Sequence, residues 1–405
     1  MHILILDTIH GGKEIGDTYA DAGNVVDVVD IYKGTTPETA EIAKIKKYDL
    51  IVAPVHMDPD HPLISNRTIP VITHHEAVRQ LLEKKIPNPM IEITGARGKT
   101  TTAHALAHIL QGNGILHTST GTIVYPTKTI LWKRSITPAS VLAAAKYARD
   151  MPGWLVAEIS LGVTGAGDLT IITSAEDYPF AAGKKFALKE KIASAQHAKR
   201  ILVAEGIFCD NENVMHIEDL VQCKGANCTV ELEGRRYTLS NPLFNLPPYR
   251  TPLMLAAAAA VILNVNPSTL DHFEALPGRM SVSHEKNLII VDNANSGANI
   301  ATTVCAAQYA RYSSKTRDLT LVIGQVSGDG AVCEGFSFDQ IITAIEKVRP
   351  SKVIWVGKIP DPGSEYYQSV QDSIDAHCTT FDEGKIIALQ KTNKGSIVLS
   401  VKTWR

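Results

Sequence analysis

The chain has 405 residues, of which 44% are hydrophobic and 20% are charged, and its formal net charge is −2 at pH 7. This composition is typical of a water-soluble globular protein, and at roughly 150 residues per domain the length suggests two or three domains. Such a chain can bury large cores without depending on disulfides. The nearly balanced charge gives no attraction for nucleic acid or for an anionic membrane, so neither is expected as a partner.

The cysteines and the apolar segments indicate a cytoplasmic protein. Six cysteines are scattered along the chain without a Cys-x-x-Cys pair: Cys209, Cys223, Cys228, Cys305, Cys333 and Cys378. This spacing disfavours a zinc site, and six free thiols are expected in a reducing compartment. The apolar run 3–6 meets Asp7 at once, unlike a signal peptide. The longest apolar stretch, Leu255 to Leu263, falls far short of the ~20 residues of a membrane helix.

Residues 1–88 predict a small N-terminal α/β domain that binds substrate. Short apolar runs bounded by turns suit buried parallel strands, and three of them occur here, at 3–6, 48–54 and 69–73. A helical pattern follows from Glu76 to Lys85. Pro87 and Pro89 then indicate a linker to the next domain.

Residues 89–276 predict an ATP-binding domain that opens with a strand from Met90 to Ile93. The helix that follows has one apolar face, formed by Ala103, Leu106, Ala107 and Leu110. Further strands are expected at 155–159, 169–173 and 200–204. A buried alanine-rich helix is expected from Leu253 to Leu263.

The segment 94–101, Thr-Gly-Ala-Arg-Gly-Lys-Thr-Thr, predicts a phosphate-binding loop. Gly95 and Gly98 let the backbone approach phosphate closely, and the N-terminus of the following helix favours an anion. Lys99 adds a positive charge, and the Thr100 hydroxyl suits Mg²⁺. A chance glycine turn with a solvated lysine is the alternative, but the strand before the loop and the helix after it argue against it. The loop is shorter than the general P-loop pattern.

Residues 277–405 predict a C-terminal α/β domain. Strands are expected at 288–291, 319–323, 353–356 and 397–401, and a helical pattern such as Phe338 to Val348 lies between strands. Strands that alternate with helices imply a parallel sheet with right-handed crossovers.

With Ile-Thr-Gly-Ala-Arg-Gly-Lys-Thr-Thr-Thr-Ala at 93–103, the chain resembles the Mur ligase family, which includes the muramyl-peptide ligases and folylpolyglutamate synthase. Further segments resemble motifs of this family in the family's order: 135–138, 156–160, 186–192, 276–280, 291–296 and 398–405. The resemblance implies an α/β fold of three domains. These are a small N-terminal Rossmann-like domain, a central P-loop ATPase domain with a parallel sheet, and a C-terminal Rossmann-like domain.

The resemblance also implies an ATP-dependent ligase that activates a substrate carboxylate as an acyl phosphate and releases ADP and phosphate. The catalytic residues that it implies are Lys99, Glu158, Lys189 and Arg279. The nucleotide contacts that it implies are Gly95, Ala96, Arg97, Gly98, Lys99, Thr100, Thr101, Arg250, Arg279, Asp292 and Asn295. The Mg²⁺ ligands that it implies are Thr100, Glu158 and Asp177, and Lys189 occupies the position of a lysine that is carbamylated in many members.

Each of these roles has an ordinary structural alternative. Glu158 could form a structural ion pair, but the cost of burying a lone carboxylate favours a metal ligand. Lys189 lies among other lysines and could equally be solvated. Asp292 could cap a helix as well as contact ribose. Arg279 could pair with a surface acid, although its Pro-Gly context favours phosphate.

Several family features are missing. Arg250 and Leu253 replace the two asparagines of the usual nucleotide-binding segment, and Tyr178 replaces a metal-binding histidine after Glu176-Asp177. No motif for an incoming amino acid is recognisable. These departures, with the short first domain and the chain end at 402–405, resemble a Mur-like branch of methanogenic archaea. Its members close a carbocyclic ring within a nickel tetrapyrrole carboxylic acid.

Such a small-molecule substrate would need cationic and apolar contacts. The candidates are Arg67, Arg97, Lys128, Lys133 and Arg134, with Tyr125 and Trp132. A group of histidines in the first domain favours surface or capping roles over substrate contact: His56, His61, His74 and His75. Two other functions stay open, an amide ligase that joins an amino acid to a carboxylate, as in pseudomurein peptides, and a nucleotide-binding regulator without catalysis. A monomer and a homodimer are both open.

Overall fold

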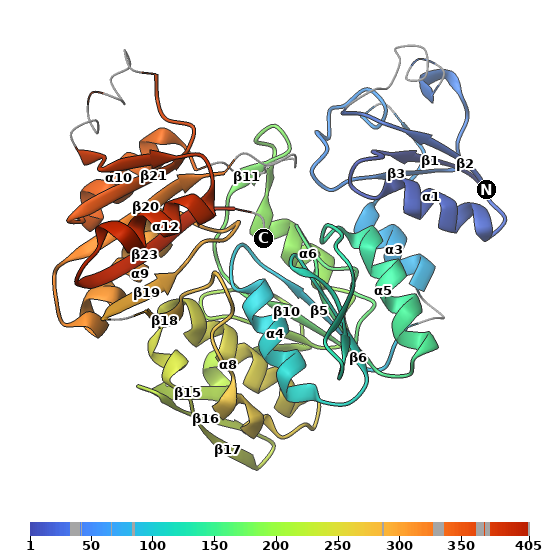
Figure 1. Cartoon of the computed structure of the whole chain (residues 1–405). Helices are drawn as coiled ribbons and strands as arrows, with labels where there is room; N and C mark the ends of the chain where they lie inside the picture. The colour runs from blue at the N-terminus through green and yellow to red at the C-terminus, as the bar shows by residue number, and fades with distance from the viewer. Residues whose placement is uncertain are drawn as a thin grey trace. The chain divides into compact units, whose positions relative to one another are not determined.

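The computed structural model describes residues 1–32, 41, 43–65, 67–82, 86–285, 287–326, 336–361, 368 and 373–403 (Figure 1). The chain forms two compact units, Met1–Phe273 and Glu274–Arg405. The three-domain division at 88/89 and 276/277 stays a prediction. The predictions made on Lys85, Cys333 and the chain end at 404–405 fall outside the described residues. No helix among the described residues is long and apolar enough to cross a bilayer.

The N-terminal sheet has four parallel strands in the order β2-β1-β3-β4. Their bounds are His2–Leu6 for β1, Val25–Val29 for β2, Leu50–Ala53 for β3 and Val71–Thr73 for β4. Helices α1 (Gly12–Asp21) and α3 (His74–Leu82) complete this part of the chain. The predicted apolar run at 3–6 is fully buried in the central strand. The chain leaves β1 for β2 on one side and later returns to β3 on the other.

The central sheet has eight strands in the order β14-β13-β10-β5-β9-β6-β7-β8. Their bounds are Met90–Thr94 (β5), Gly114–Thr118 (β6), Gly121–Tyr125 (β7), Thr129–Trp132 (β8), Trp154–Glu158 (β9), Leu169–Ile172 (β10), Ile201–Val203 (β13) and Val214–His216 (β14). The pairs from β14 to β6 are parallel, as predicted. Strand β7 is antiparallel to both of its neighbours, β6 and β8, because a tight turn after β6 returns the chain alongside that strand.

Helices cover both faces of this sheet (Figure 1). Their bounds are Lys99–Leu110 (α4), Pro138–Asp150 (α5), Ala187–Ala195 (α6), Ile217–Leu220 (α7) and Pro247–Ile262 (α8). Successive side chains of a strand point to opposite faces. In β9, Leu155 and Ala157 share a core with α5, whereas the carboxylate of Glu158 accepts a hydrogen bond from Thr100 of α4.

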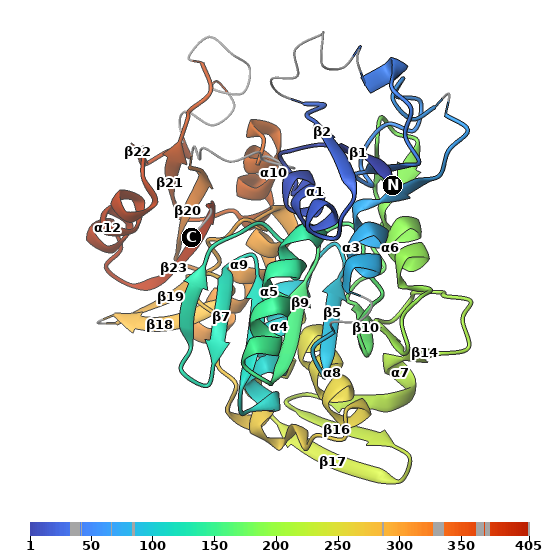
Figure 2. The ribbon, with the colours of Figure 1, turned by 90° about the vertical axis from the view of Figure 1, so that its right-hand side faces the viewer.

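A small antiparallel sheet lies against α8 (Figure 2). Its strands are β15 (Val221–Lys224), β16 (Asn227–Leu232) and β17 (Arg235–Ser240), and the 3₁₀ helices η1 (Pro242–Asn245) and η2 (Pro267–His272) lie nearby in the chain. This sheet was not predicted. Helix α8 begins at Pro247 rather than at Leu253, because prolines at the first helical positions lack only N–H groups that would have no intrahelical partner.

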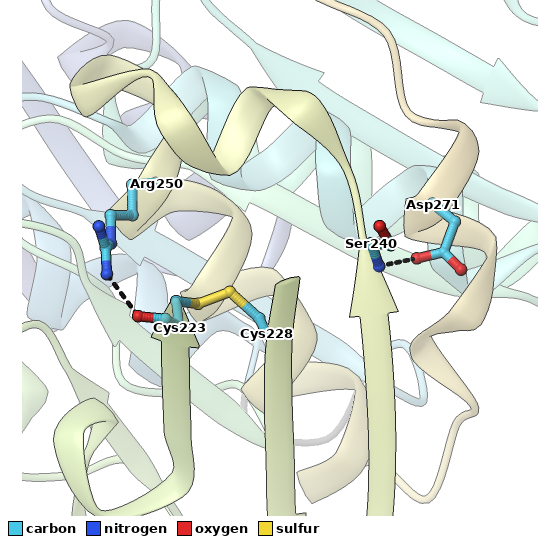
Figure 3. Close-up of a disulfide and its surroundings, with 5 residues drawn as sticks. All are labelled: Cys223, Cys228, Ser240, Arg250 and Asp271. Atoms are coloured by element: carbon cyan, nitrogen blue, oxygen red, sulfur yellow. Dashed lines mark hydrogen bonds between the residues drawn. A yellow bond between two sulfur atoms is a disulfide. The ribbon is translucent and has the colours of Figure 1, made fainter. Parts of the chain in front are cut away.

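Cys223 and Cys228 face each other across β15 and β16 and form a disulfide (Figure 3). The expectation of six free thiols is therefore wrong for this pair. The hairpin brings the two residues into register, which their spacing in the sequence does not reveal. Among the described cysteines, Cys209, Cys305 and Cys378 are free.

The second unit contains a sheet of six strands in the order β18-β19-β23-β20-β21-β22. Their bounds are Ser281–Glu285 (β18), Leu288–Asp292 (β19), Leu319–Gln325 (β20), Lys352–Gly357 (β21), Ala376–Cys378 (β22) and Gly395–Lys402 (β23). All pairs are parallel except β18 with β19. The described helices are α9 (Ile300–Ser314), α10 (Phe338–Val348) and α12 (Phe381–Lys391), and α10 has the predicted bounds.

Candidate active site

The predicted phosphate-binding loop joins β5 to α4 and is held from the side by the end of β10. The hydroxyl of Thr173 donates to the carbonyl oxygens of Thr94, at 3.1 Å, and Arg97, at 2.5 Å. Gly95 has a φ of +148°, and a Cβ on it would lie 2.1 Å from Thr173 Oγ1. Only glycine fits there, because any side chain would push the loop off its neighbour. These contacts fix the shape of the loop.

Glu158 lies at the end of β9, beside the N-terminus of α4. Its carboxylate is buried and accepts hydrogen bonds from Thr100 Oγ1 at 2.9 Å and from the Ser119 N–H at 3.2 Å. The ammonium of Lys99 lies 3.8 Å from Glu158 Oε1 and donates to the Gly95 carbonyl at 3.0 Å. The structure therefore brings together three residues predicted for the site from two separate segments. Carboxylate and hydroxyl oxygens are donors that suit Mg²⁺.

Arg97 and Asp177, which were also predicted for the site, interact with other groups of the protein. Arg97 forms an ion pair with Glu176 at 2.6 Å, and both side chains are well exposed. Asp177 Oδ1 accepts from the N–H groups of Tyr178, at 3.0 Å, and Leu188, at 2.8 Å, so it caps the start of α6. The metal-binding role of Asp177 stays a prediction.

The two lysines in the middle of α6 differ sharply in burial. Lys189, for which carbamylation was predicted, is exposed. Lys191 is 1% exposed, and its Nζ lies 5.1 Å from the centre of the Tyr178 ring, with no hydrogen-bond partner among the described residues. Burial, with the charge of Lys99, lowers the pKa of Lys191 to about 8.

Arg250 lies in the first turns of α8 and donates to the Cys223 carbonyl at 2.7 Å, which ties α8 to the small sheet (Figure 3). On the other side of that sheet, Asp271 accepts from the Ser240 N–H at 2.7 Å. Helix α8 also reaches the phosphate-binding loop, since a Cβ on Gly98 would lie 3.3 Å from Pro252 Cγ. The nucleotide contact of Arg250 stays a prediction.

In the second unit, the segments around Arg279 and Asp292 are joined by a side chain. Asn295 donates a hydrogen bond of 2.7 Å to the carbonyl oxygen of Gly278. Gly278 directly precedes Arg279 in the predicted Pro-Gly-Arg segment. Asp292 accepts from the Ala294 N–H at 3.0 Å, whereas Asn299 caps α9. The alternative that Asp292 caps a helix is therefore wrong.

Some predicted contacts are used to hold the fold. Arg67 donates to the carbonyl oxygens of Ala43 and Lys44. His74 and His75 are buried and donate to the carbonyl oxygens of Leu6 and Ser160, each at 2.9 Å. A surface position is therefore wrong for these two histidines, which instead hold α3 to the end of β1 and to the segment that follows β9. The guanidinium of Arg134, in contrast, lies over Trp132 at 5.3 Å and is exposed.

A second buried carboxylate, Glu92 in β5, was not singled out from the sequence. It accepts from Thr164 N, Thr164 Oγ1, Gly165 N and Gly167 N at 2.6–3.3 Å. Burial raises the pKa of Glu92, while these hydrogen bonds lower it. The loop that supplies these bonds connects β9 to β10, so Glu92 fixes the two strands that flank β5.

Comparison with known proteins gives the same assignment as the motifs. Residues 282–403 match the family model described as "Coenzyme F430 synthetase CfbE, C-terminal domain". Coenzyme F(430) synthetase of Methanosarcina acetivorans is 29% identical over 476 residues, with 100% of this chain and 98% of the relative covered. The chain is thus similar along its whole length to a protein of this name. The enzyme of the same name from Methanocaldococcus jannaschii is 24% identical, with 95% and 96% covered.

A solved structure has a similar fold. The crystal structure of the MurF ligase from Thermotoga maritima in complex with ADP superposes with a TM-score of 0.52, at 14% identity, and the match covers 93% of this chain and 91% of that one. At this identity the match establishes the Mur ligase fold alone. The α/β fold class predicted from the sequence is confirmed.

Proposed function

We propose that the protein is an ATP-dependent, ADP-forming ligase of the coenzyme F(430) synthetase type. It would activate a propionate carboxylate of a nickel tetrapyrrole acid and close a carbocyclic ring with a ketone. The observation that carries this proposal is the similarity to two curated coenzyme F(430) synthetases along nearly the whole chain. The bonded group of Lys99, Thr100 and Glu158 supports it, because it offers a cation and oxygen donors beside a preformed anion-binding loop.

In this proposal the loop binds the phosphates of ATP. Backbone N–H groups of 95–101 and the positive end of the α4 dipole would face the phosphates, and Lys99 would leave the Gly95 carbonyl to pair with the outermost one. Thr100 and Glu158 would hold Mg²⁺, which when bound neutralises part of the phosphate charge. The ADP complex of the MurF relative supports nucleotide binding by this fold.

The chemistry requires two anions to approach each other. A carboxylate oxygen attacks the γ-phosphorus, and the bond from that phosphorus to the ADP oxygen breaks. A carbon of the same tetrapyrrole then attacks the acyl carbon and loses its proton, and phosphate leaves with the former carboxylate oxygen. The chain's contribution is mainly positioning and charge, for which Lys99 lies in the loop. Arg279 of the second unit, with Asp292 and Asn295, is proposed as a further nucleotide contact.

A carbamylated lysine at position 191 in α6 would place a negatively charged group near the ammonium of Lys99. Carbamylation needs a neutral amine, and the lowered pKa of Lys191 supports that residue over the exposed Lys189. Mass spectrometry of the intact protein in bicarbonate buffer, compared between Lys189→Gln and Lys191→Gln, would assign the modified position. Loss of the carbamate adduct in Lys189→Gln alone would restore Lys189 as the site.

The function is tested by phosphate and ADP release from ATP in the presence of the nickel tetrapyrrole acid and without any amine. The proposal predicts release that depends on the acid and is abolished in Lys99→Met. Release that requires an amino acid would identify an amide ligase instead. Binding of ATP without any turnover would identify a regulator.

A further inference from the structure

A cluster of an aspartate and two histidines lies at the carboxyl ends of β1 and β3 in the N-terminal sheet. Asp7 directly follows β1, His10 lies in the turn before α1, and His56 follows β3. In the strand order β2-β1-β3, the chain passes from β1 to β2 on one side of β1 and then to β3 on its other side. Such a topological switch point is where open α/β sheets bind ligands. The proposed phosphate chemistry uses none of these three residues.

The three ligand-type atoms of this cluster converge. Asp7 Oδ2 lies 2.6 Å from His10 Nδ1 and 4.0 Å from His56 Nε2. All three atoms lie within 4.8 Å of one another. Atoms bonded to one metal ion at about 2.0–2.2 Å have similar separations, so a shared ion would require only small movements.

His56 carries an unmet hydrogen-bonding need. Its Nε2 is buried from solvent and has no hydrogen-bond partner among the residues that the structure describes. A buried polar atom without a hydrogen-bond partner is energetically unfavourable and points to a missing ligand, ion or water. This atom faces Asp7, so an ion between the two would satisfy it.

The cluster is also held rigidly. Asp7 is fully buried, has a φ of +80°, and accepts on Oδ1 from the N–H groups of Ile9 and His10 at 2.8 and 3.2 Å. Its Oδ2 is thereby turned toward the imidazoles. Tyr32 stacks on His56 at 5.7 Å and meets His10 edge-on at 5.6 Å. A non-glycine residue at positive φ is uncommon, and such residues concentrate at functional sites.

We propose that Asp7, His10 and His56 bind a late first-row transition-metal ion. Two imidazoles with one carboxylate suit nickel, cobalt and zinc, whereas Mg²⁺ prefers oxygen donors. Nickel can reach the cluster as a free ion. It can also arrive at the centre of a tetrapyrrole, where an imidazole nitrogen would become an axial ligand. This second source rests on the proposed function, and the first does not.

The free-ion source is tested on the metal-free full-length protein in excess Mg²⁺. Co²⁺ binding is followed by visible absorption and Ni²⁺ binding by calorimetry. We expect His10→Phe and His56→Phe each to weaken binding by at least about 10–100-fold, and the double variant to weaken it further, since even the loss of an outer group that supports a metal ligand has an effect of this size. Phenylalanine keeps a ring in place and removes the nitrogen atoms. His61→Phe, which alters the same region outside the cluster, should bind as the wild type does.

The tetrapyrrole source is tested with a nickel tetrapyrrole acid and no ATP. An axial imidazole should change the absorption bands of the nickel complex in the wild type, and the change should be lost in the double variant His10→Phe/His56→Phe, with circular dichroism confirming its fold. Loss of binding in the variants in either experiment supports the proposal. It is overturned if the wild type binds neither probe, or if the double variant binds both probes as the wild type does. Neither readout needs ligase turnover, so failure of the proposed reaction would be seen separately.

Discussion

Individual residues of the site were predicted from the sequence when their type and position were informative together. Lys99 and Thr100 follow a glycine loop, and Glu158 ends an apolar strand. The three residues lie together in the structure. Glu92 lies in an equally apolar strand, but its hydrogen-bond donors come from residues 164–167 and are invisible in its local sequence. Long-range partners of this kind decide whether a buried carboxylate supports the fold or serves a ligand.

Replacing Glu158 by glutamine tests its predicted role. The amide keeps the size of the side chain and an oxygen that can accept from Thr100, but it removes the negative charge. We expect substrate-dependent phosphate release to fall by about 10²–10³-fold, the usual effect of losing one electrostatic group of an active site, with little change in melting temperature. Glu176→Gln, at an exposed ion pair with Arg97, is the matched control and should retain most activity. Full activity of Glu158→Gln would exclude a catalytic role.

Lys191 gives a pH-dependent prediction about stability. Its pKa is about 8 in the folded protein, against about 10.4 in an unfolded chain. Between these values the unfolded state binds more protons, so the buried lysine makes the free energy of unfolding rise with pH. We expect Lys191→Met to be more stable than the wild type at pH 7 and to lose this rise. Denaturant unfolding from pH 7 to 10 in bicarbonate-free buffer measures it.

The exposed Lys189 provides the control for that experiment. Lys189→Met lies in the same helix and should keep the wild-type dependence on pH. An unchanged dependence in Lys191→Met would show that the pKa of Lys191 is ordinary in the folded state.

Elements were predictable where local signals were strong. Helix α10 was predicted with its bounds from its helical pattern, and in the structure Ser337 and Gln340 form a capping box at its start. The apolar strands β1, β5 and β20 were also found. The β7–β8 hairpin and the β15–β17 sheet were missed, since their strands are partly exposed and depend on cross-strand partners. The disulfide was missed for the same reason.

The loop between β5 and α4 is sensitive to one added methyl group. In Gly95→Ala the new Cβ would clash with Thr173 Oγ1, and φ would be unfavourable. We expect the affinity for ADP, measured by calorimetry, to fall at least about tenfold, since backbone N–H groups aim at phosphate only in one loop geometry.

Gly183→Ala is the matched control for that variant. Gly183 also has a positive φ, of +77°, but a Cβ there would meet no atom within 4 Å. Its replacement should lower stability by about 1–2 kcal/mol and leave ADP affinity unchanged. Equal ADP affinity in Gly95→Ala and the wild type would mean that the loop does not bind the nucleotide.

For the molecule as a whole, the assignment of the fold and the proposal of the substrate rest on different observations. Sheet topology and similarity to MurF establish the Mur ligase fold, which serves several substrates within one family. The substrate class instead rests on similarity to coenzyme F(430) synthetases along nearly the whole chain. Spacing and hydrophobic pattern predict a phosphate-binding loop, whereas the acyl-phosphate ligase and the tetrapyrrole substrate were implied by the family resemblance.

The central claim is that a tetrapyrrole carboxylate is activated as an acyl phosphate. It is tested most directly by labelling that carboxylate with heavy oxygen and analysing the released phosphate by mass spectrometry. Transfer of one labelled oxygen into phosphate, with a cyclised ketone as the product and no amine present, is the predicted result. Phosphate that carries only oxygen from water or ATP would contradict the account.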